Sequence, residues 1–364
     1  MNELPIKEKI KLSRITNWLI ILAVFTFCLV YFQNILKPFI LAVVFWYMIS
    51  EFRDLLARIK VRNRSLPRWI RTTIAFLVLF FLIEIVTEIL INNTRQILRD
   101  VPEFNNIDLN YIDEIGRSLK IEDLSGVIGD QISSIDLAGI LTNILNSFRS
   151  MVEDIIMIIV YIIFLLIEEA GVSKKLRAIF QLRSDYENLS MVLNQISIAI
   201  NKYITLKTII SLLAGVLCYL ICILFKIDYP FLWAFITFVL NFIPYIGAFI
   251  ATLLPALYAA FQFRSFLFFI WVFLAIEGLH MFIGNYVEPK FTGKSLNLSP
   301  LVVVIALTFW GYIWGIAGMI LSVPIMSIIT IILAQFPDTR FLAILLSETG
   351  DIKSLKVDNE KEIT

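Results

Sequence analysis

Three stretches decide the fold: NFIPYIGAFIATLLP (241–255), GNYVEPKFTGKSLNLSP (284–300) and GYIWGIAGMILSVP (311–324). They lie in an almost continuously apolar window, residues 241–324, which holds 7 of the 14 Gly and 5 of the 11 Pro in the chain. Inside a bilayer, backbone that leaves the helix is tolerated only where protein buries it or where it lines a wet cavity. Transporters place their solute sites at such interrupted helices. The window therefore indicates a membrane transporter rather than an inert anchor.

The composition of the whole chain is that of a membrane protein. Hydrophobic residues make up 59% of the 364 residues and charged residues 17%, whereas soluble domains have about 45–50% and about 25%. The formal net charge is +1, and no basic cluster is interleaved with aromatic residues, so nucleic acid is not an expected partner. We predict an all-α polytopic membrane protein surrounded by the lipid bilayer.

Apolar runs of near-spanning length predict about seven to eight transmembrane helices, counting the broken ones. The uninterrupted runs are residues 15–32, 36–50, 69–91, 151–167, 204–225 and 266–283. Few polar residues separate the first two runs, which predicts a tight hairpin around Gln33, Asn34 and Lys37.

Charge sets the predicted orientation. Basic residues gather in the N-terminal arm, after the second run and in residues 168–202, whereas residues 92–147 carry nine acidic and four basic side chains. The positive-inside rule then predicts that residues 92–147 lie outside and that both termini lie in the cytoplasm.

The chain divides into four predicted regions. Residues 1–91 form the N-terminal hairpin and third span, 92–147 an extracytoplasmic segment, 148–336 the transporter core with broken helices, and 337–364 a cytoplasmic tail. Within the second region, apolar residues recur at helical spacing from Leu119 to Leu145, which predicts two or three amphipathic helices. Their apolar faces could cover the membrane surface, another subunit or their own protomer.

Two Gly- and Pro-broken regions, residues 229–262 and 300–335, are too long for one comfortable crossing and very short for two. If the run at 204–225 ends outside, the first region begins and ends outside and the second begins and ends inside. Two re-entrant hairpins would then enter from opposite faces, as in inverted-repeat transporters. Two full crossings per region give the same parity, and glycine also serves close helix packing, so these alternatives remain open.

The motifs PYIGAFIATLLP, GNYVEPK and the run from Pro300 into GIAGMILSVP, in this order, resemble the signature of the autoinducer-2 exporter (AI-2E) family. The early stretch LKPFILAVVFWYMI is similar to the N-terminal part of that family, so the resemblance covers nearly the full chain. It implies a multi-pass protein of the bacterial inner (cell) membrane and a homo-oligomer such as a pentamer. It also implies export of the signalling furanone or, as for other members, sodium–proton exchange.

The helix breaks are the predicted contact points for a small polar solute. Asn241 and Tyr245 offer polar side chains next to the first break, and the glycines of both breaks offer unpaired peptide groups. The predicted solute-binding residues are Asn241, Pro244, Tyr245, Gly247 and Gly318.

Two acidic pairs are candidates for coupling to Na⁺ or H⁺, because a charge at bilayer depth costs about 2.5–3.5 kcal/mol on insertion scales. Glu84 and Glu88 lie one turn apart and share a helix face. They could bind a cation or carry a proton. Alternatively, one or both could pair with a basic residue such as Arg71, Lys202 or Lys207, or reach the outer water from the end of the span. Glu277 and His280, the one histidine of the chain, could relay protons or form a polar contact between helices.

Three residues of the GNYVEPK region, Asn285, Glu288 and Lys290, follow the run at 266–283 on its predicted cytoplasmic side. They are candidates for gating an inner vestibule by alternating ion pairs, or they belong to a solvated loop.

No enzyme signature accompanies these motifs. The sequence has no phosphate-binding glycine loop with lysine and no nucleophile–His–acid set. The cysteines have no His or carboxylate at metal-ligand spacing, so we expect no metal and no cofactor. The leading hypothesis is a secondary transporter that exports a small polar solute. The alternatives are a monovalent cation–proton antiporter and a structural or assembly protein of the membrane.

Overall fold

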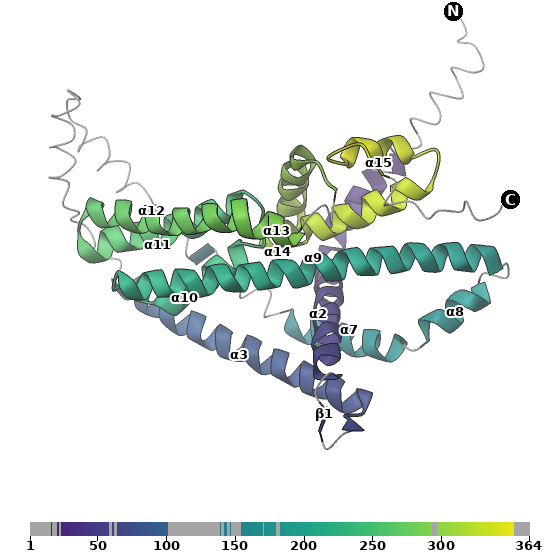
Figure 1. Ribbon diagram of the computed structural model, residues 1–364, viewed down its shortest axis with the longest axis horizontal. Helices are drawn as coiled ribbons and strands as arrows, with labels where there is room; N and C mark the ends of the chain where they lie inside the picture. The colour runs from purple at the N-terminus through teal and green to yellow at the C-terminus, as the bar shows by residue number, and fades with distance from the viewer. Residues whose placement is uncertain are drawn as a thin grey trace, which may run out of the picture.

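The structure, a computed structural model, describes residues 23–57, 60–61, 64–100, 154–169, 171–179, 183–292 and 297–352, with residues 16, 20–21, 139, 142–143 and 146. Most of the described chain is helical (Figure 1). The helices are α2 (Gln33–Ala57), α3 (Arg68–Asp100), α7 (Ile155–Glu168), α8 (Val172–Ile179), α9 (Arg183–Leu224), α10 (Pro230–Leu240), α11 (Ile246–Phe263), α12 (Phe266–Phe282), the π-helix η2 (Ile283–Val287), α13 (Glu288–Thr292), α14 (Pro300–Gln335) and α15 (Arg340–Leu346). Two-residue strands β1 (Lys60–Val61) and β2 (Arg64–Ser65) pair antiparallel between α2 and α3.

Six helical stretches among the described residues are long and apolar enough to cross a membrane. They are Gln33–Ala57, Arg68–Val86, Tyr186–Leu224, Ile246–Phe263, Phe266–Lys290 and Pro300–Gln335. The helices α7 and α10 are equally apolar but shorter. The prediction of an all-α polytopic membrane protein is confirmed.

The N-terminal part of the chain bends where a tight hairpin was predicted. Residues 23–31 are helical, Phe32 forms a turn and α2 follows directly. The N–H of Phe32 donates to the carbonyl of Cys28, and the N–H of Leu36 donates to the carbonyl of Phe32. Because this α-helical hydrogen bonding continues through the turn, the chain does not fold back here. Three polar residues in an apolar run were too weak a signal for a reversal.

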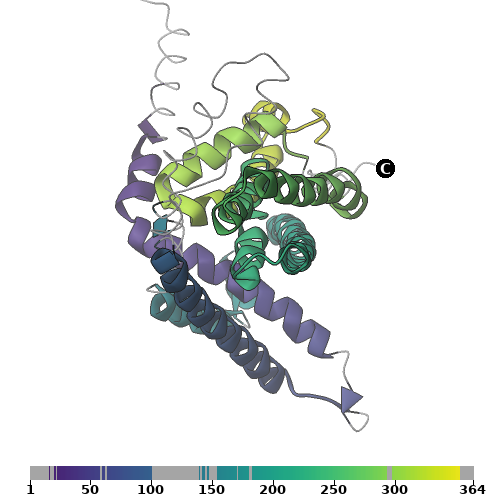
Figure 2. The same ribbon diagram turned by 90° about the vertical axis from the view of Figure 1, so that its left-hand side faces the viewer.

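The helices α2, α3 and α7 pack together around a small core (Figure 2). Its buried members from these helices are Leu41, Ala42, Ile49, Ala75, Ile158 and Ile162. The predicted extracytoplasmic segment lies almost entirely outside the described residues. Only its first nine residues, at the end of α3, and four isolated positions are described.

The helix α9 is the longest described helix, and α10 and α12 both pack along it. Figure 1 shows α10, α11 and α12 gathered beside the half of α9 that ends at Leu224. The core there is built around two large side chains, Trp233 of α10 and Tyr258 of α11, whose ring centroids lie 5.2 Å apart. The indole N–H of Trp233 donates to the carbonyl of Asp228, which anchors the start of α10.

The helices α10 and α11 form the first hairpin, residues 230–263. The chain reverses after Leu240, and Tyr245 takes a backbone conformation (φ 62°, ψ −62°) that is costly for any residue with a side chain. The two arms then touch, because a Cβ on Gly247 would lie 1.8 Å from the carbonyl oxygen of Leu240. Only glycine fits at this crossing.

The helix α14 is itself a second hairpin, residues 300–335, broken at Gly315 (φ 64°, ψ −144°). A Cβ on Gly318 would lie 1.9 Å from the carbonyl oxygen of Trp310. In an unbroken α-helix these two residues would be about 12 Å apart along the axis, so the chain folds back between them. The second hairpin thus repeats the glycine-on-carbonyl contact of the first.

The bases of the two hairpins contact different parts of α9. At the base of the first, Gln262 bonds the backbone of Lys226 and Asp228, directly after α9 ends. At the base of the second, Leu298 packs against Ile200 and Tyr203 near the middle of α9. Residues 200–224 of α9 rise about 36 Å, more than a hydrocarbon core of about 30 Å. The entry of the two hairpins from opposite faces of a bilayer stays a prediction.

The tail that follows the second hairpin packs onto its base. The N–H of Ser299 donates to the carbonyl of Leu346 at the end of α15, and Asn297 donates to the carbonyl of Asp351. Ile352 is buried beside Ala334 and Ala343.

Candidate functional site

A polar stripe runs along the buried face of α9. Tyr203, Lys207 and Ser211 lie one turn apart and share a face, and each is more than nine-tenths buried. The hydroxyl of Tyr203 has no hydrogen-bond partner among the residues that the structure describes. Polar groups of this kind are costly in an apolar span, so the stripe needs partners from neighbouring elements.

The tip of the first hairpin supplies one partner. The side-chain amide of Asn241 donates to the hydroxyl of Ser211 across 3.0 Å, and both residues are buried. Ser211 lies 13 residues before the end of α9, about 20 Å from the base of the hairpin. The tip therefore ends at mid-depth of the span, where Asn241, predicted as a solute contact, meets the polar stripe.

The GNYVEPK region supplies the second partner. The ammonium group of Lys207 lies 2.8 Å from Oε1 of Glu288, the first residue of α13. The Lys207 side chain is 7% exposed and that of Glu288 is 36% exposed. A buried ammonium in an apolar span is stabilised mainly by such a partner, so the structure assigns Glu288 an interaction that the sequence left open.

Two further predicted residues, Glu277 and His280, lie on α12. His280 is buried, its Nε2 atom has no hydrogen-bond partner among the described residues, and it interacts electrostatically with Lys207. Oε2 of Glu277 is likewise buried without a partner in the described part of the chain. Of the predicted coupling pair, His280 thus lies near Lys207 of the stripe, and both residues have buried atoms without hydrogen-bond partners among the described residues.

Other predicted residues have different surroundings. Asn285 and Lys290 are exposed, as is Tyr245 at the tip of the first hairpin, and Pro244 is partly buried there. The peptide N–H of Gly247 donates to Ile243 within the turn, so the glycines of both breaks serve close packing of the hairpin arms. Their role in binding a solute stays a prediction.

Glu84 and Glu88 are exposed on α3. Two of the basic partners considered for them are engaged elsewhere, Lys207 with Glu288 and Arg71 with the carbonyl of Arg53.

The sequence analysis missed Lys207, Ser211 and Tyr203 as site residues. Lys207 carried a usable signal, because it is a charged residue near the start of the apolar run at 204–225. It was weighed only as a partner for Glu84 and Glu88, since nothing in the sequence places GNYVEPK beside α9.

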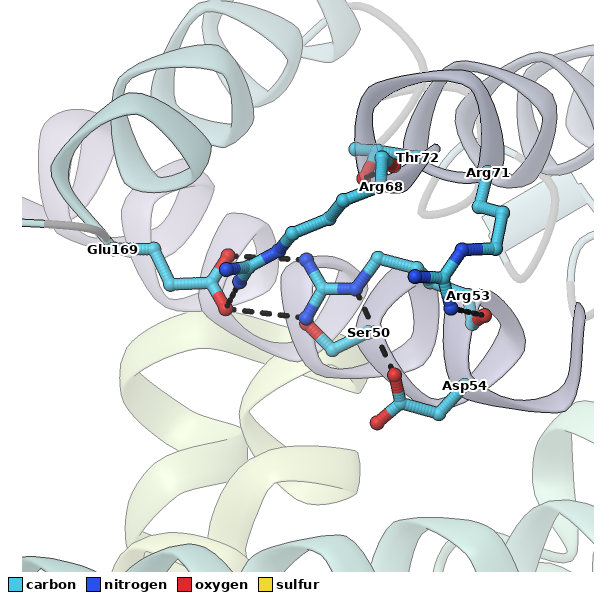
Figure 3. Close-up of polar contacts among 7 residues, drawn as sticks. All are labelled: Ser50, Arg53, Asp54, Arg68, Arg71, Thr72 and Glu169. Carbon is cyan, nitrogen blue, oxygen red and sulfur yellow. Dashed lines mark hydrogen bonds and ion pairs between the residues drawn. The ribbon is translucent and has the colours of Figure 1, made fainter. Parts of the chain in front are cut away.

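A second charged cluster joins α2, α3 and the end of α7 (Figure 3). The Arg53 guanidinium donates to both carboxylate oxygens of Glu169 at 3.1 Å, and Arg68 donates to Oε1 at 2.6 Å. Burial raises the pKa of Glu169, but the hydrogen bonds and charge of Arg53, together with the charge of Arg68, outweigh it and leave the pKa below its ordinary value of 4.5. The cluster ties three helices together outside the polar stripe.

The cluster predicts acid sensitivity. A carboxyl whose pKa is lower in the folded state stabilises the fold above its unfolded pKa, and this stabilisation is lost as the pH falls through the folded pKa. We therefore expect the thermal unfolding midpoint in detergent to fall as the pH is lowered below 4.5, and Glu169→Gln to remove part of this dependence. The control is Glu168→Gln, an exposed neighbour that pairs with Lys175. An unchanged pH profile in Glu169→Gln would contradict the role of the cluster.

Apolar spans, two helix breaks and a buried polar stripe that meets the first break are typical of a multi-pass membrane protein of the transporter class. The model of the AI-2E transporter family matches residues 19–338, and the chain belongs to this family. It is 26% identical over 322 residues to the AI-2 transport protein TqsA of Escherichia coli K12. The matched region covers 86% of this chain and 90% of TqsA. It is 28% identical over 311 residues to a predicted transport protein of Haemophilus influenzae, covering 80% of this chain and 85% of that protein.

Proposed function

We propose that the protein is a secondary transporter that exports a small polar solute, with autoinducer-2 as the first candidate. The observation that carries the proposal is the contact between Asn241 at the tip of the first hairpin and Ser211, which lies on α9 13 residues before its end. A polar solute that leaves water loses its hydrogen bonds to water, and hydrogen-bonding groups buried at a helix break would replace them. The printed name of TqsA, an AI-2 transport protein, supports the choice of solute.

A monovalent cation–proton antiporter is the second candidate. It is favoured by Glu277 and His280, two titratable side chains with buried atoms that lack hydrogen-bond partners in the described chain. Membrane-embedded groups of this type are common in proton relays. The same groups could couple solute export to an ion gradient.

We also propose a homo-oligomer in the cell membrane with both termini in the cytoplasm. Glu84 and Glu88 support the oligomer, because exposed carboxylates on a membrane helix are costly against lipid and cheaper against a second copy or a wet interface.

The test is flux in liposomes that contain the purified protein. Release of trapped autoinducer-2 under an imposed Na⁺ or H⁺ gradient would support the first candidate. Na⁺/H⁺ exchange without autoinducer-2 would support the second. Absence of both activities under every gradient would contradict coupled transport and favour a structural or assembly role.

We expect Asn241→Ala to lower the flux about tenfold, because it removes the hydrogen bond to Ser211 and a polar group from the predicted solute site. Asn34→Ala, an exposed asparagine on α2, is the matched control and should transport at the parental rate. The measurement is the initial rate of release at several solute concentrations. Parental rates in Asn241→Ala would exclude the hairpin tip as the solute site.

A further inference from the structure

The Lys207–Glu288 ion pair lies directly after a π-helical segment. The helix α12 runs into the π-helix Ile283–Val287, and the N–H of Glu288 donates to the carbonyl of Ile283, five residues back. Short π-helices are rare and frequently lie at functional sites. A return to α-helical hydrogen bonding would turn the following residues by about 100°, which would carry Glu288 away from Lys207.

The surroundings allow such a rearrangement. Gly284, within the π-helix, has no atom within 4 Å of where a Cβ would be. Pro289 follows Glu288 and has no N–H to donate to the preceding turn. Asn285, Tyr286 and Lys290 are exposed. The main side chains that would have to repack if this segment turned are Ile283 and Val287, which pack against α9.

The pair also lies at a junction of the polar stripe. Lys207 is one turn from Ser211, which contacts the hairpin tip, and one turn from Tyr203, which packs against Leu298 at the base of the second hairpin. Lys207 lies one turn from Ser211 on the side of the N-terminal half of α9. The ion pair bridges α9 and α13 at this point.

We propose that the Lys207–Glu288 ion pair is a gate that closes the site at the tip of the first hairpin toward the N-terminal half of α9. The π-helix Ile283–Val287 is its hinge. In the closed state Glu288 neutralises Lys207, and in the open state the pair separates and the path beside Ser211 becomes wet. This inference rests on the proposed transport function but concerns access to the site rather than the solute.

The test measures water access at Ser211 in the full chain. Ser211→Cys is reconstituted in liposomes, and its reaction with a membrane-impermeant cationic methanethiosulfonate reagent is timed from each side of the membrane. The same protocol on the parent chain gives the background of Cys28, Cys218 and Cys222. Glu288→Gln and Lys207→Met are then added singly to Ser211→Cys, and Asp338→Asn, an exposed carboxylate far along the chain, is the matched control.

We expect slow labelling in Ser211→Cys and in the Asp338→Asn control. Either Glu288→Gln or Lys207→Met should accelerate labelling about tenfold or more from one side only, since a minor open state is commonly populated at about 0.1–10%. Unchanged rates in both variants, with elution profiles on size exclusion like that of the parent, would overturn the gate. Acceleration from both sides equally would also overturn it, because it would indicate general loosening. Labelling requires no flux, so failure of every solute in the transport assay leaves this result interpretable.

Discussion

Replacing Gly247 by alanine should destabilise the protein by about 3 kcal/mol or more and abolish transport. The added methyl group would clash with backbone atoms, and no flexible side chain could move aside to relieve the clash. The added Cβ would lie 1.8 Å from the carbonyl oxygen of Leu240, so the arms of the first hairpin would be forced apart. Gly318→Ala should act the same way on the second hairpin, where the distance to the Trp310 oxygen is 1.9 Å. The measurements are the thermal unfolding of the purified protein in detergent and flux in liposomes.

Gly278→Ala is the matched control. Gly278 lies in α12, and a Cβ there meets nothing within 4 Å. Because alanine is the better helix former, this variant should be as stable as the parent or more stable by up to about 1 kcal/mol. Parental stability in Gly247→Ala would show that the arms do not touch as described, and the helix break would lose its structural explanation.

The second large effect is expected at the buried ion pair. Glu288→Leu should lower the free energy of unfolding by about 3–5 kcal/mol, because it leaves the ammonium of Lys207 buried without its partner. Lys207→Met should cost clearly less, since the Glu288 side chain is 36% exposed and can be hydrated when it is alone. The double variant should lie within about 1 kcal/mol of the parent or above it, because an apolar pair often replaces a buried ion pair without loss.

This cycle is measured by denaturant titration in detergent for the parent, both single variants and the double variant. Its coupling energy should be large and favourable to the pair. Additive single effects would mean that Lys207 and Glu288 do not depend on each other in the folded protein.

Much of this architecture could be predicted from residue types alone. The apolar runs and the clustered Gly and Pro of residues 241–324 predict spans and two broken hairpins, because a bilayer allows few other solutions. The bend at Phe32 could not be predicted, since it depends on local backbone hydrogen bonds that a few polar residues do not specify.

The site was predicted in part. Asn241 and Glu288 stood out because their motifs interrupt helices, and the structure brings both to α9. Lys207, Ser211 and Tyr203 did not stand out, because a stripe at four-residue spacing becomes meaningful only when its partners are known. Those partners lie 30 residues away for Ser211 and 81 residues away for Lys207.

The locked tips of the hairpins have a mechanical consequence. Two arms that touch through a glycine cannot separate at the tip, so any movement of a hairpin about its base would carry both arms together. At the base of the first hairpin, Lys226, Tyr229 and Arg264 all have positive φ values of 51–56°. Residues with such strained backbone conformations are suited to act as hinges, because small backbone rotations there relieve strain while they displace the distant tip. Rotations at these hinges would move the segment from Tyr229 to Asn241, and with it the side-chain amide that contacts Ser211.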